Sequence, residues 1–244
     1  MDILYADTNV LVVNKPSGLA TVPGSWDEES TSLVKALEGE YGRLWVVHRL
    51  DKVTSGLVIL ALNPQAHRQL SMQFEHHETH KLYHAVVAGV PAWEEHTARH
   101  PLRINVGHSH RTTVDNDKGK PSETAFQVIE RFNGYALISA TPATGRTHQV
   151  RVHFAALGCP ILGDATYGRS PRDLAVREIA HTLGRQALHA RALGFFHPKT
   201  GAWLEFQSEP PADFSAALDS LRVLAAEDRA KADARDRARS RKGG

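Results

Sequence analysis

The stretch His48-Arg49-Leu50-Asp51-Lys52-Val53-Thr54-Ser55-Gly56-Leu57 joins a polar loop to an apolar run over residues 57–62. This run has the length and the β-branched content of a buried strand. The carboxylate of Asp51 therefore stands on a loop anchored to rigid structure, where a reactive group is best positioned. The residues alone leave an alternative open, in which Asp51 only caps the Thr-Ser-Gly turn or pairs with Arg49.

The remaining sequence predicts more strands than helices. Strands are expected over residues 3–6, 10–15, 82–89, 122–131, 135–141, 186–197 and 202–208. Helices are expected after Thr31 or Ser32, from Pro64 behind an Asn63 N-cap, over residues 147–157 and over residues 212–226. Because most strands follow one another in hairpin-like succession, the pattern favours an α+β fold with a mixed, largely antiparallel sheet flanked by helices.

Length and composition are those of a globular protein. The 244 residues are 41% hydrophobic and 23% charged, and they include a single cysteine, Cys159. No apolar run approaches the roughly 18 residues of a membrane helix, and the N-terminus lacks a signal-peptide pattern. The lone cysteine fits a reducing compartment. We therefore expect no membrane contact and a cytoplasmic location.

The basic pI originates in the last residues of the chain. Of 29 basic and 27 acidic residues, eight and four lie in residues 222–244, which leaves 21 and 23 in the rest. Residues 229–244 contain alanine and charged residues with almost no large apolar side chain. The sequence therefore predicts one domain over residues 1–226 and a charged, disordered tail over residues 227–244.

Further blocks of sequence carry a family resemblance. In chain order with the opening decapeptide, they are Lys15-Pro16-Ser17-Gly18, residues 81–89, residues 144–153 with 158–164, and Leu188-His189-Ala190 with Phe196-His197-Pro198. Together they span about residues 3–214 and resemble the RluA-type pseudouridine synthases, which isomerise uridine to pseudouridine within RNA. The resemblance implies a single catalytic domain of the pseudouridine synthase fold, with a central RNA-binding cleft.

The resemblance also implies roles for three residues at the reacting centre. Asp51 corresponds to the catalytic aspartate, and Tyr83 to a tyrosine that stacks on the base and takes part in proton transfer at C5. Isomerisation breaks an N-glycosidic bond and forms a C–C bond, so a carboxylate that attacks or stabilises an electron-poor ribose is chemically suitable. A guanidinium can hold such a carboxylate. Arg146 is the expected partner, with Arg151 as the second candidate.

Substrate-binding roles follow from the same resemblance. Arg49 is expected to occupy the space that a flipped nucleotide leaves, and flipping itself costs a few kcal/mol. Leu188 is expected to pack on the base, while His148 and Arg151 are expected to contact RNA. His48 is expected to be structural.

A metal site and a cofactor are not expected. The densest histidine run, Glu75-His76-His77-Glu78-Thr79-His80, is one residue short of the H-E-x-x-H zinc pattern, and no cysteine pair is present. No nucleotide-binding glycine motif appears. Two alternatives remain open from the sequence: a catalytically silent RNA-binding protein on the same fold, and a metal-dependent hydrolase that uses residues 75–80.

RNA is the expected partner. Many RluA-type relatives carry an S4-type RNA-binding domain before the catalytic domain, whereas the first predicted strand here begins at Ile3. Recognition is therefore expected from the catalytic domain, which favours a compact stem-loop in tRNA or rRNA. No heptad pattern or apolar surface suggests an oligomer, so a monomer is expected. Whether Asp51 attacks C1′ or C6, or assists a glycal route, is open.

Overall fold

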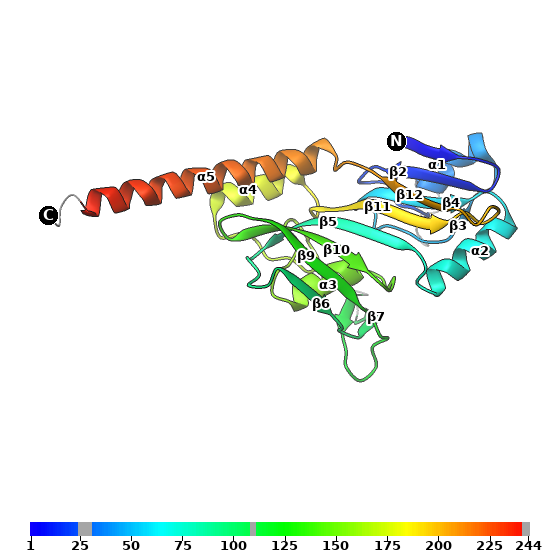
Figure 1. The fold of residues 1–244 in the computed structure, drawn as a ribbon, viewed down its shortest axis with the longest axis horizontal. Helices are drawn as coiled ribbons and strands as arrows, with labels where there is room; N and C mark the ends of the chain where they lie inside the picture. Colours follow the sequence, from blue (N-terminus) through cyan, green and yellow to red (C-terminus); the bar gives the residue numbers. More distant parts are fainter. Residues whose placement is uncertain (24–30, 108–110, 241–244) are drawn as a thin grey trace.

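The computed structural model describes residues 1–23, 31–107 and 111–240. Its main element is one twisted sheet (Figure 1) in the order β1-β2-β4-β11-β5-β10-β9-β6, with β12 also paired to β11 and β3 to β4. The strands are β1 (Asp2–Ala6), β2 (Val10–Lys15), β3 (Trp45–Val46), β4 (Ser55–Ala61), β5 (His80–Ala88), β6 (Glu95–Ala98), β9 (Thr124–Arg131), β10 (Tyr135–Pro142), β11 (Leu188–Phe196) and β12 (Trp203–Gln207). The expected mixed, largely antiparallel sheet is confirmed, because β4 and β11 are parallel and the other pairs are antiparallel.

Five helices lie among the described residues: α1 (Leu33–Tyr41), α2 (Pro64–Glu75), α3 (Gln149–Ala156), α4 (Leu174–Leu183) and α5 (Ala212–Ser240). The expected starts of the first two are confirmed, since Ser32 caps α1 and Asn63 caps α2. A separate two-stranded hairpin, β7 (Leu102–Val106) and β8 (Arg111–Val114), lies in the polar segment that precedes β9. None of the described helices is long and apolar enough to cross a membrane.

Strand β4 is buried on both faces, which explains its uninterrupted apolar sequence. Val58 and Leu60 pack in one core cluster with the apolar face of α1. Leu57 and Ile59 point to the opposite face and pack with Leu70 of α2. A strand covered on both sides loses the polar alternation of a half-exposed strand, so this run gives the Asp51 loop a rigid base.

Gly56 fixes how the end of the Asp51 loop enters the sheet. Its backbone has φ +114°, and a Cβ atom there would lie 2.2 Å from the carbonyl oxygen of Ala190 on β11. The parallel pairing of β4 with β11 at these residues therefore requires a glycine.

One helix was not expected, and the expected end of another is wrong. Helix α4 was not predicted, although Asp173 caps its first turn and Gly184 ends it in a left-handed conformation. Helix α5 was expected to end near residue 226 but continues to Ser240, where it leaves the body as a rod (Figure 1). Residues 227–240 are thus helical, not disordered, because alanine, arginine and lysine are strong helix formers and Glu227 pairs with Lys231 one turn on.

Candidate active site

A cleft of about 770 Å³ opens where the Asp51 loop faces the turn before α3. All seven residues to which the sequence assigned a catalytic or binding role line it: Arg49, Asp51, Tyr83, Arg146, His148, Arg151 and Leu188. They come from the β3–β4 loop, from β5, from the α3 region and from the start of β11. The sheet therefore brings together residues that lie up to 139 positions apart in the sequence.

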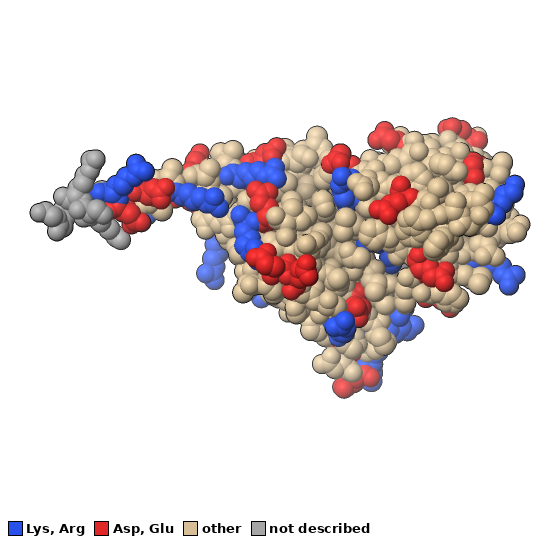
Figure 2. Space-filling view, viewed as in Figure 1, with Lys and Arg blue, Asp and Glu red and all other residues tan. Residues whose placement is uncertain are grey.

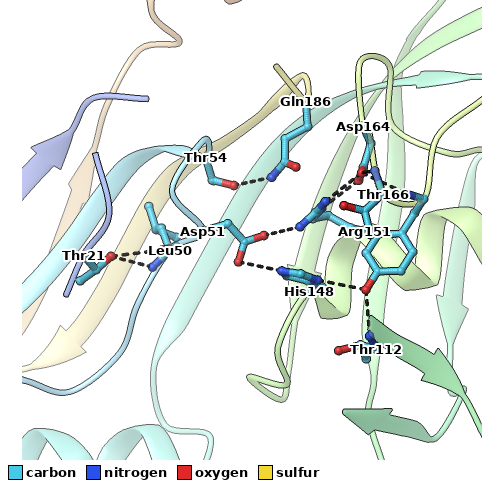
Figure 3. A network of polar contacts seen from close by, with 11 residues as sticks. Thr21, Leu50, Asp51, Thr54, Thr112, His148, Arg151, Asp164, Thr166 and Gln186 are labelled. Atoms are coloured by element: carbon cyan, nitrogen blue, oxygen red, sulfur yellow. Dashed lines mark hydrogen bonds and ion pairs between the residues drawn. The ribbon is translucent and has the colours of Figure 1, made fainter. Parts of the chain in front are cut away.

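The Asp51 loop is held from the N-terminal part of the chain. The Thr21 hydroxyl donates to the carbonyl of Leu50 (3.1 Å) and accepts from the Leu50 amide (3.2 Å), as Figure 3 shows. The buried ammonium of Lys15 donates to the carbonyl oxygen of Lys52 (3.3 Å). These bonds fix the main chain on both sides of Asp51.

Arg151, not Arg146, is the guanidinium partner of Asp51. Its Nη1 donates to Asp51 Oδ2 at 2.9 Å, while Nε and Nη2 donate to the two carboxylate oxygens of Asp164 at 2.8 Å each (Figure 3). The expectation for Arg146 is wrong because α3 begins at Gln149, which places Arg151 inside the helix and leaves Arg146 in the preceding turn. There Arg146 points to the carbonyl oxygen of Pro121 (3.4 Å).

Burial makes the pair of Arg151 and Asp164 a rigid support. The side chain of Arg151 is 7% exposed and that of Asp164 is fully buried. Burial opposes both charges, yet the hydrogen bonds and ion pairs between the two residues raise the pKa of Arg151 and lower the pKa of Asp164. Asp164 also accepts from the amides of Thr166 (2.9 Å) and Tyr167 (3.1 Å), so both carboxylate oxygens are used.

The second oxygen of Asp51 has a looser contact. His148 Nε2 lies 3.7 Å from Asp51 Oδ1, and His148 Nδ1 lies 3.0 Å from the hydroxyl of Tyr167. That hydroxyl accepts from the backbone amide of Thr112 (3.0 Å), so its own proton is free to go to Nδ1. Burial lowers the pKa of His148. The hydrogen-bond network thus assigns a neutral imidazole with its proton on Nε2, directed at Asp51.

Tyr83 and Leu188 form an apolar wall beside Asp51. Tyr83 lies on β5 and packs against the cluster that contains the buried Leu188. Burial first, and then the charge of Asp51, raise the pKa of Tyr83, so its phenol is protonated at neutral pH. Its hydroxyl makes no hydrogen bond within the described ranges, which leaves it available to a bound molecule.

Arg49 and His48 behave differently although they are adjacent. Arg49 is exposed at the cleft and has no carboxylate partner among residues 1–23, 31–107 and 111–240, so the alternative of a simple salt bridge is not supported. His48 accepts from the Ile59 amide (3.0 Å) and stacks on Phe74 with ring centroids 4.6 Å apart. His48 therefore packs the loop, as expected.

The sequence did not single out Asp164 or Tyr167. A signal for Asp164 was present, since a buried arginine that holds a catalytic carboxylate needs a second anion. Tyr167 had no comparable signal, because its role depends on the meeting of α3 with β8. In the part of the chain that the structure describes, no three His, Cys, Asp or Glu side chains are grouped so that they could hold a metal ion.

This fold and site define a class of proteins that carry a loop aspartate over a cleft in a mixed sheet. A model of the family described as RNA pseudouridylate synthase matches residues 9–156. The chain is 42% identical over 208 residues to the dual-specificity RNA pseudouridine synthase RluA of Vibrio parahaemolyticus, covering 83% of this chain and 80% of that protein. It is 36% identical over 233 residues to the ribosomal large subunit pseudouridine synthase D of Zymomonas mobilis, with coverage of 91% and 73%.

A solved structure gives the same result. The human RNA pseudouridylate synthase domain containing 4 superposes with a TM-score of 0.74 at 26% identity, covering 90% of this chain and 92% of that one. The chain belongs to the RNA pseudouridylate synthase family. It is an enzyme that isomerises uridine in RNA to pseudouridine, and nothing in these comparisons supports a silent RNA-binding protein.

Proposed function

We propose that Asp51 carries the isomerisation through its Oδ1 atom. The observation that supports this is the unequal use of its two oxygens, since Oδ2 accepts a 2.9 Å bond from Arg151 whereas Oδ1 has only a 3.7 Å contact with His148 Nε2 and no hydrogen bond among the described residues. Arg151 orients the carboxylate and balances its charge. Oδ1 is then the atom that attacks C1′ or C6, or removes the C2′ proton in a glycal route.

Tyr83 and Leu188 hold the uracil while its bond to the ribose is broken. Stacking on an aromatic ring and packing against a buried leucine retain a base that is no longer covalently attached. After C5 has bonded to C1′, the C5 proton must leave. We propose that the Tyr83 oxygen relays it: the phenol accepts the C5 proton as it passes its own proton to solvent water in the cleft, because the raised pKa of this phenol disfavours a free phenolate.

Arginines around the cleft bind the RNA. Arg49 is exposed and without a carboxylate partner in the described ranges, which suits insertion into the space left by the flipped nucleotide. Arg146 lines the same cleft, and in the described part of the chain its guanidinium bonds only to the carbonyl oxygen of Pro121, so we assign it to RNA contact instead of to catalysis. His148 is proposed to steer Asp51, and through Tyr167 it connects the carboxylate to hairpin β7–β8.

The substrate proposed is a structured uridine in tRNA, in rRNA or in both. The support is similarity to two relatives, one named as a dual-specificity RNA pseudouridine synthase and the other as a pseudouridine synthase of the large ribosomal subunit. We further propose that the catalytic domain spans residues 1–226 and that the protein acts as a cytoplasmic monomer. Gel filtration with light scattering tests the oligomeric state.

Tritium release from RNA that carries [5-³H]uridine tests the central proposal. Unmodified transcripts of tRNA and of large-subunit rRNA are supplied separately to the wild type and to Asp51→Asn. Release by the wild type and a loss of at least about 10³-fold in Asp51→Asn are expected, as for removal of an essential nucleophile. Turnover by a correctly folded Asp51→Asn enzyme would remove Asp51 from the mechanism.

A further inference from the structure

Lys81 is a buried cation in the cleft, and no carboxylate of the described residues pairs with it. It lies on β5 two residues before Tyr83, so the two side chains share one face of the strand, and both line the cleft. The side chain is 7% exposed. Within the described ranges it has neither an ion pair nor a hydrogen bond, and its Nζ lies 5.9 Å from the ring centroid of Phe74.

The electrostatics of the neighbourhood agree with an unbalanced charge. Burial lowers the pKa of Lys81 to about 8, and no carboxylate contributes to that shift. By contrast, Asp51 acts on two other groups: burial lowers the pKa of Lys15 to about 8 against the opposing charge of Asp51, and burial together with the charge of Asp51 raises the pKa of Tyr83. Lys81 itself acts on His48, whose pKa burial and this ammonium lower to about 3. Asp51 is thus not the partner of Lys81, and the imidazole of His48, which the ammonium of Lys81 affects, is neutral.

The ammonium is nevertheless open to a ligand. Among the described side chains, the polar atoms that are fully enclosed without a hydrogen-bond partner are the hydroxyls of Thr79 and Thr112. The Lys81 ammonium is not among them, so it is reached from the cleft. A buried cation without a partner costs stability, and such a residue is expected where a ligand supplies the missing charge.

We propose that Lys81 binds a backbone phosphate of the RNA, next to the nucleotide that enters the cleft. This inference rests on the proposed function and extends it to a phosphate subsite. The backbone phosphates are the negatively charged groups of RNA, and a lysine ammonium binds a phosphate as a point charge with three hydrogen-bond donors. Tyr83 and Leu188 are assigned to the base and Asp51 to the reacting centre, so the phosphate is the part of the nucleotide that remains for Lys81.

Binding assays on an inactive parent test the subsite. Asp51→Asn serves as the parent, so that RNA is bound but not converted, and unmodified tRNA and large-subunit rRNA transcripts are the probes. In this parent, Lys81→Gln is expected to weaken the Kd by about 5- to 30-fold at 0.1 M salt. It should also lower the slope of log K against log salt by about 0.7–0.9, which is the loss of one phosphate contact. Lys199→Gln, at an exposed turn outside the cleft, is the matched control and should change neither quantity.

The pH dependence separates this cation from its neighbours. From pH 7 to pH 9 the parent should lose RNA affinity by up to about tenfold as Lys81 is deprotonated, whereas Lys81→Arg should not. The other titratable groups that line the cleft are His48, Arg49, Asp51, Glu75, His77, Tyr83, Arg146, His148 and Arg151. Lys15, whose pKa is also about 8, contacts the Asp51 loop. Asp51 is replaced in both proteins that are compared and the others are retained in Lys81→Arg, so their contributions cancel.

Two results would decide against the subsite, and a third against the proposed substrate. An unchanged Kd and salt slope in Lys81→Gln would make Lys81 structural, and a lower kcat at unchanged Kd in the active background would place it on the reacting base. Failure of the parent to bind either RNA would refute the proposed substrate instead. Lys81→Met guards against misfolding, because removing an unpaired buried charge should leave the Tm equal or higher.

Discussion

Asp164→Asn provides the sharpest test of how the catalytic carboxylate is held. Asp164 Oδ1 accepts from Arg151 Nη2 and from the amides of Thr166 and Tyr167, whereas Oδ2 accepts only from Arg151 Nε. An asparagine can keep the three bonds to Oδ1, but its amide NH₂ then faces the Nε–H of Arg151. The substitution therefore removes one charge-assisted hydrogen bond and one buried negative charge with little change in shape.

The expected loss of stability is large for an isosteric change. A charge-assisted hydrogen bond contributes about 1.5–3 kcal/mol, and breaking a buried ion pair from one side costs about 3–5 kcal/mol. Asp51 still compensates part of the Arg151 charge, so we expect a loss of about 3 kcal/mol. For a chain of this size that lowers the Tm by about 6–12 °C. Since Arg151 then holds Asp51 less firmly, kcat should fall at least about tenfold.

The pH dependence supplies a second, independent readout. Arg151 and the amides of Tyr167 and Thr166 outweigh burial and hold the pKa of Asp164 below its ordinary value of 3.8. A lowered folded-state pKa contributes stability above the unfolded-state value, and this contribution is lost as the pH falls through the folded-state value. The difference in Tm between the wild type and Asp164→Asn should thus be constant above about pH 5 and shrink below about pH 4.

Glu94→Gln is the control, because Glu94 pairs with Arg131 at 2.7 Å while being 76% exposed. An exposed pair contributes about 1 kcal/mol or less, so Tm and kcat should stay close to wild type. Calorimetry and tritium release measure both quantities. If Asp164→Asn has the same Tm and kcat as Glu94→Gln, the pair of Arg151 and Asp164 does not support the Asp51 carboxylate in the way that its geometry indicates.

Three further predictions concern single groups. Arg151→Ala should lower tritium release by at least about 10³-fold. Arg146→Ala should keep kcat but weaken RNA affinity, with a slope of log K against log salt that is smaller by about 0.7–0.9. Equal losses of kcat in the two variants would return Arg146 to the reacting centre. Tyr83→Phe keeps the stacking ring and should lower kcat by about 10²-fold or more with little change in KM, and wild-type kcat would rule out the proton relay. Gly56→Ala should lower the free energy of unfolding in urea by about 3 kcal/mol or more, because the added Cβ would meet the Ala190 carbonyl and the backbone has a positive φ. Wild-type stability of this variant would show that β4 and β11 can separate there.

Local patterns in the sequence predicted the elements that depend on local physics. The run over residues 57–62, the Ser32 and Asn63 caps and the neighbouring strands expected over residues 122–131 and 135–141 each depend on local sequence, and each is present in the structure. Helix α5 past residue 226 is also local in origin, although the low apolar content of this segment predicts disorder. Helix propensity and side-chain pairing continue the helix to Ser240 without a core.

The partner of Asp51 could not be settled locally. Arg146 and Arg151 are five positions apart, and the residue at which α3 begins decides which of them faces the carboxylate. Helix ends are uncertain by one or two residues even in a known structure, and one residue turns a side chain by about 100°. The position of Lys81 in the cleft and the pairing of Asp164 with Arg151 depend on the order of the whole sheet, which no local pattern encodes.

The site is consequently a property of two parts of the chain that meet across the sheet. Lys15 and Thr21 fix the Asp51 main chain from the N-terminal side, while Arg151 fixes its carboxylate from α3, a hundred positions further on. Because Oδ2 is held by the far side and the backbone by the near side, a shift of one side relative to the other rotates Oδ1. Substitutions that alter the packing between β4 and β11, and not only those that line the cleft, should therefore change kcat more than they change RNA affinity.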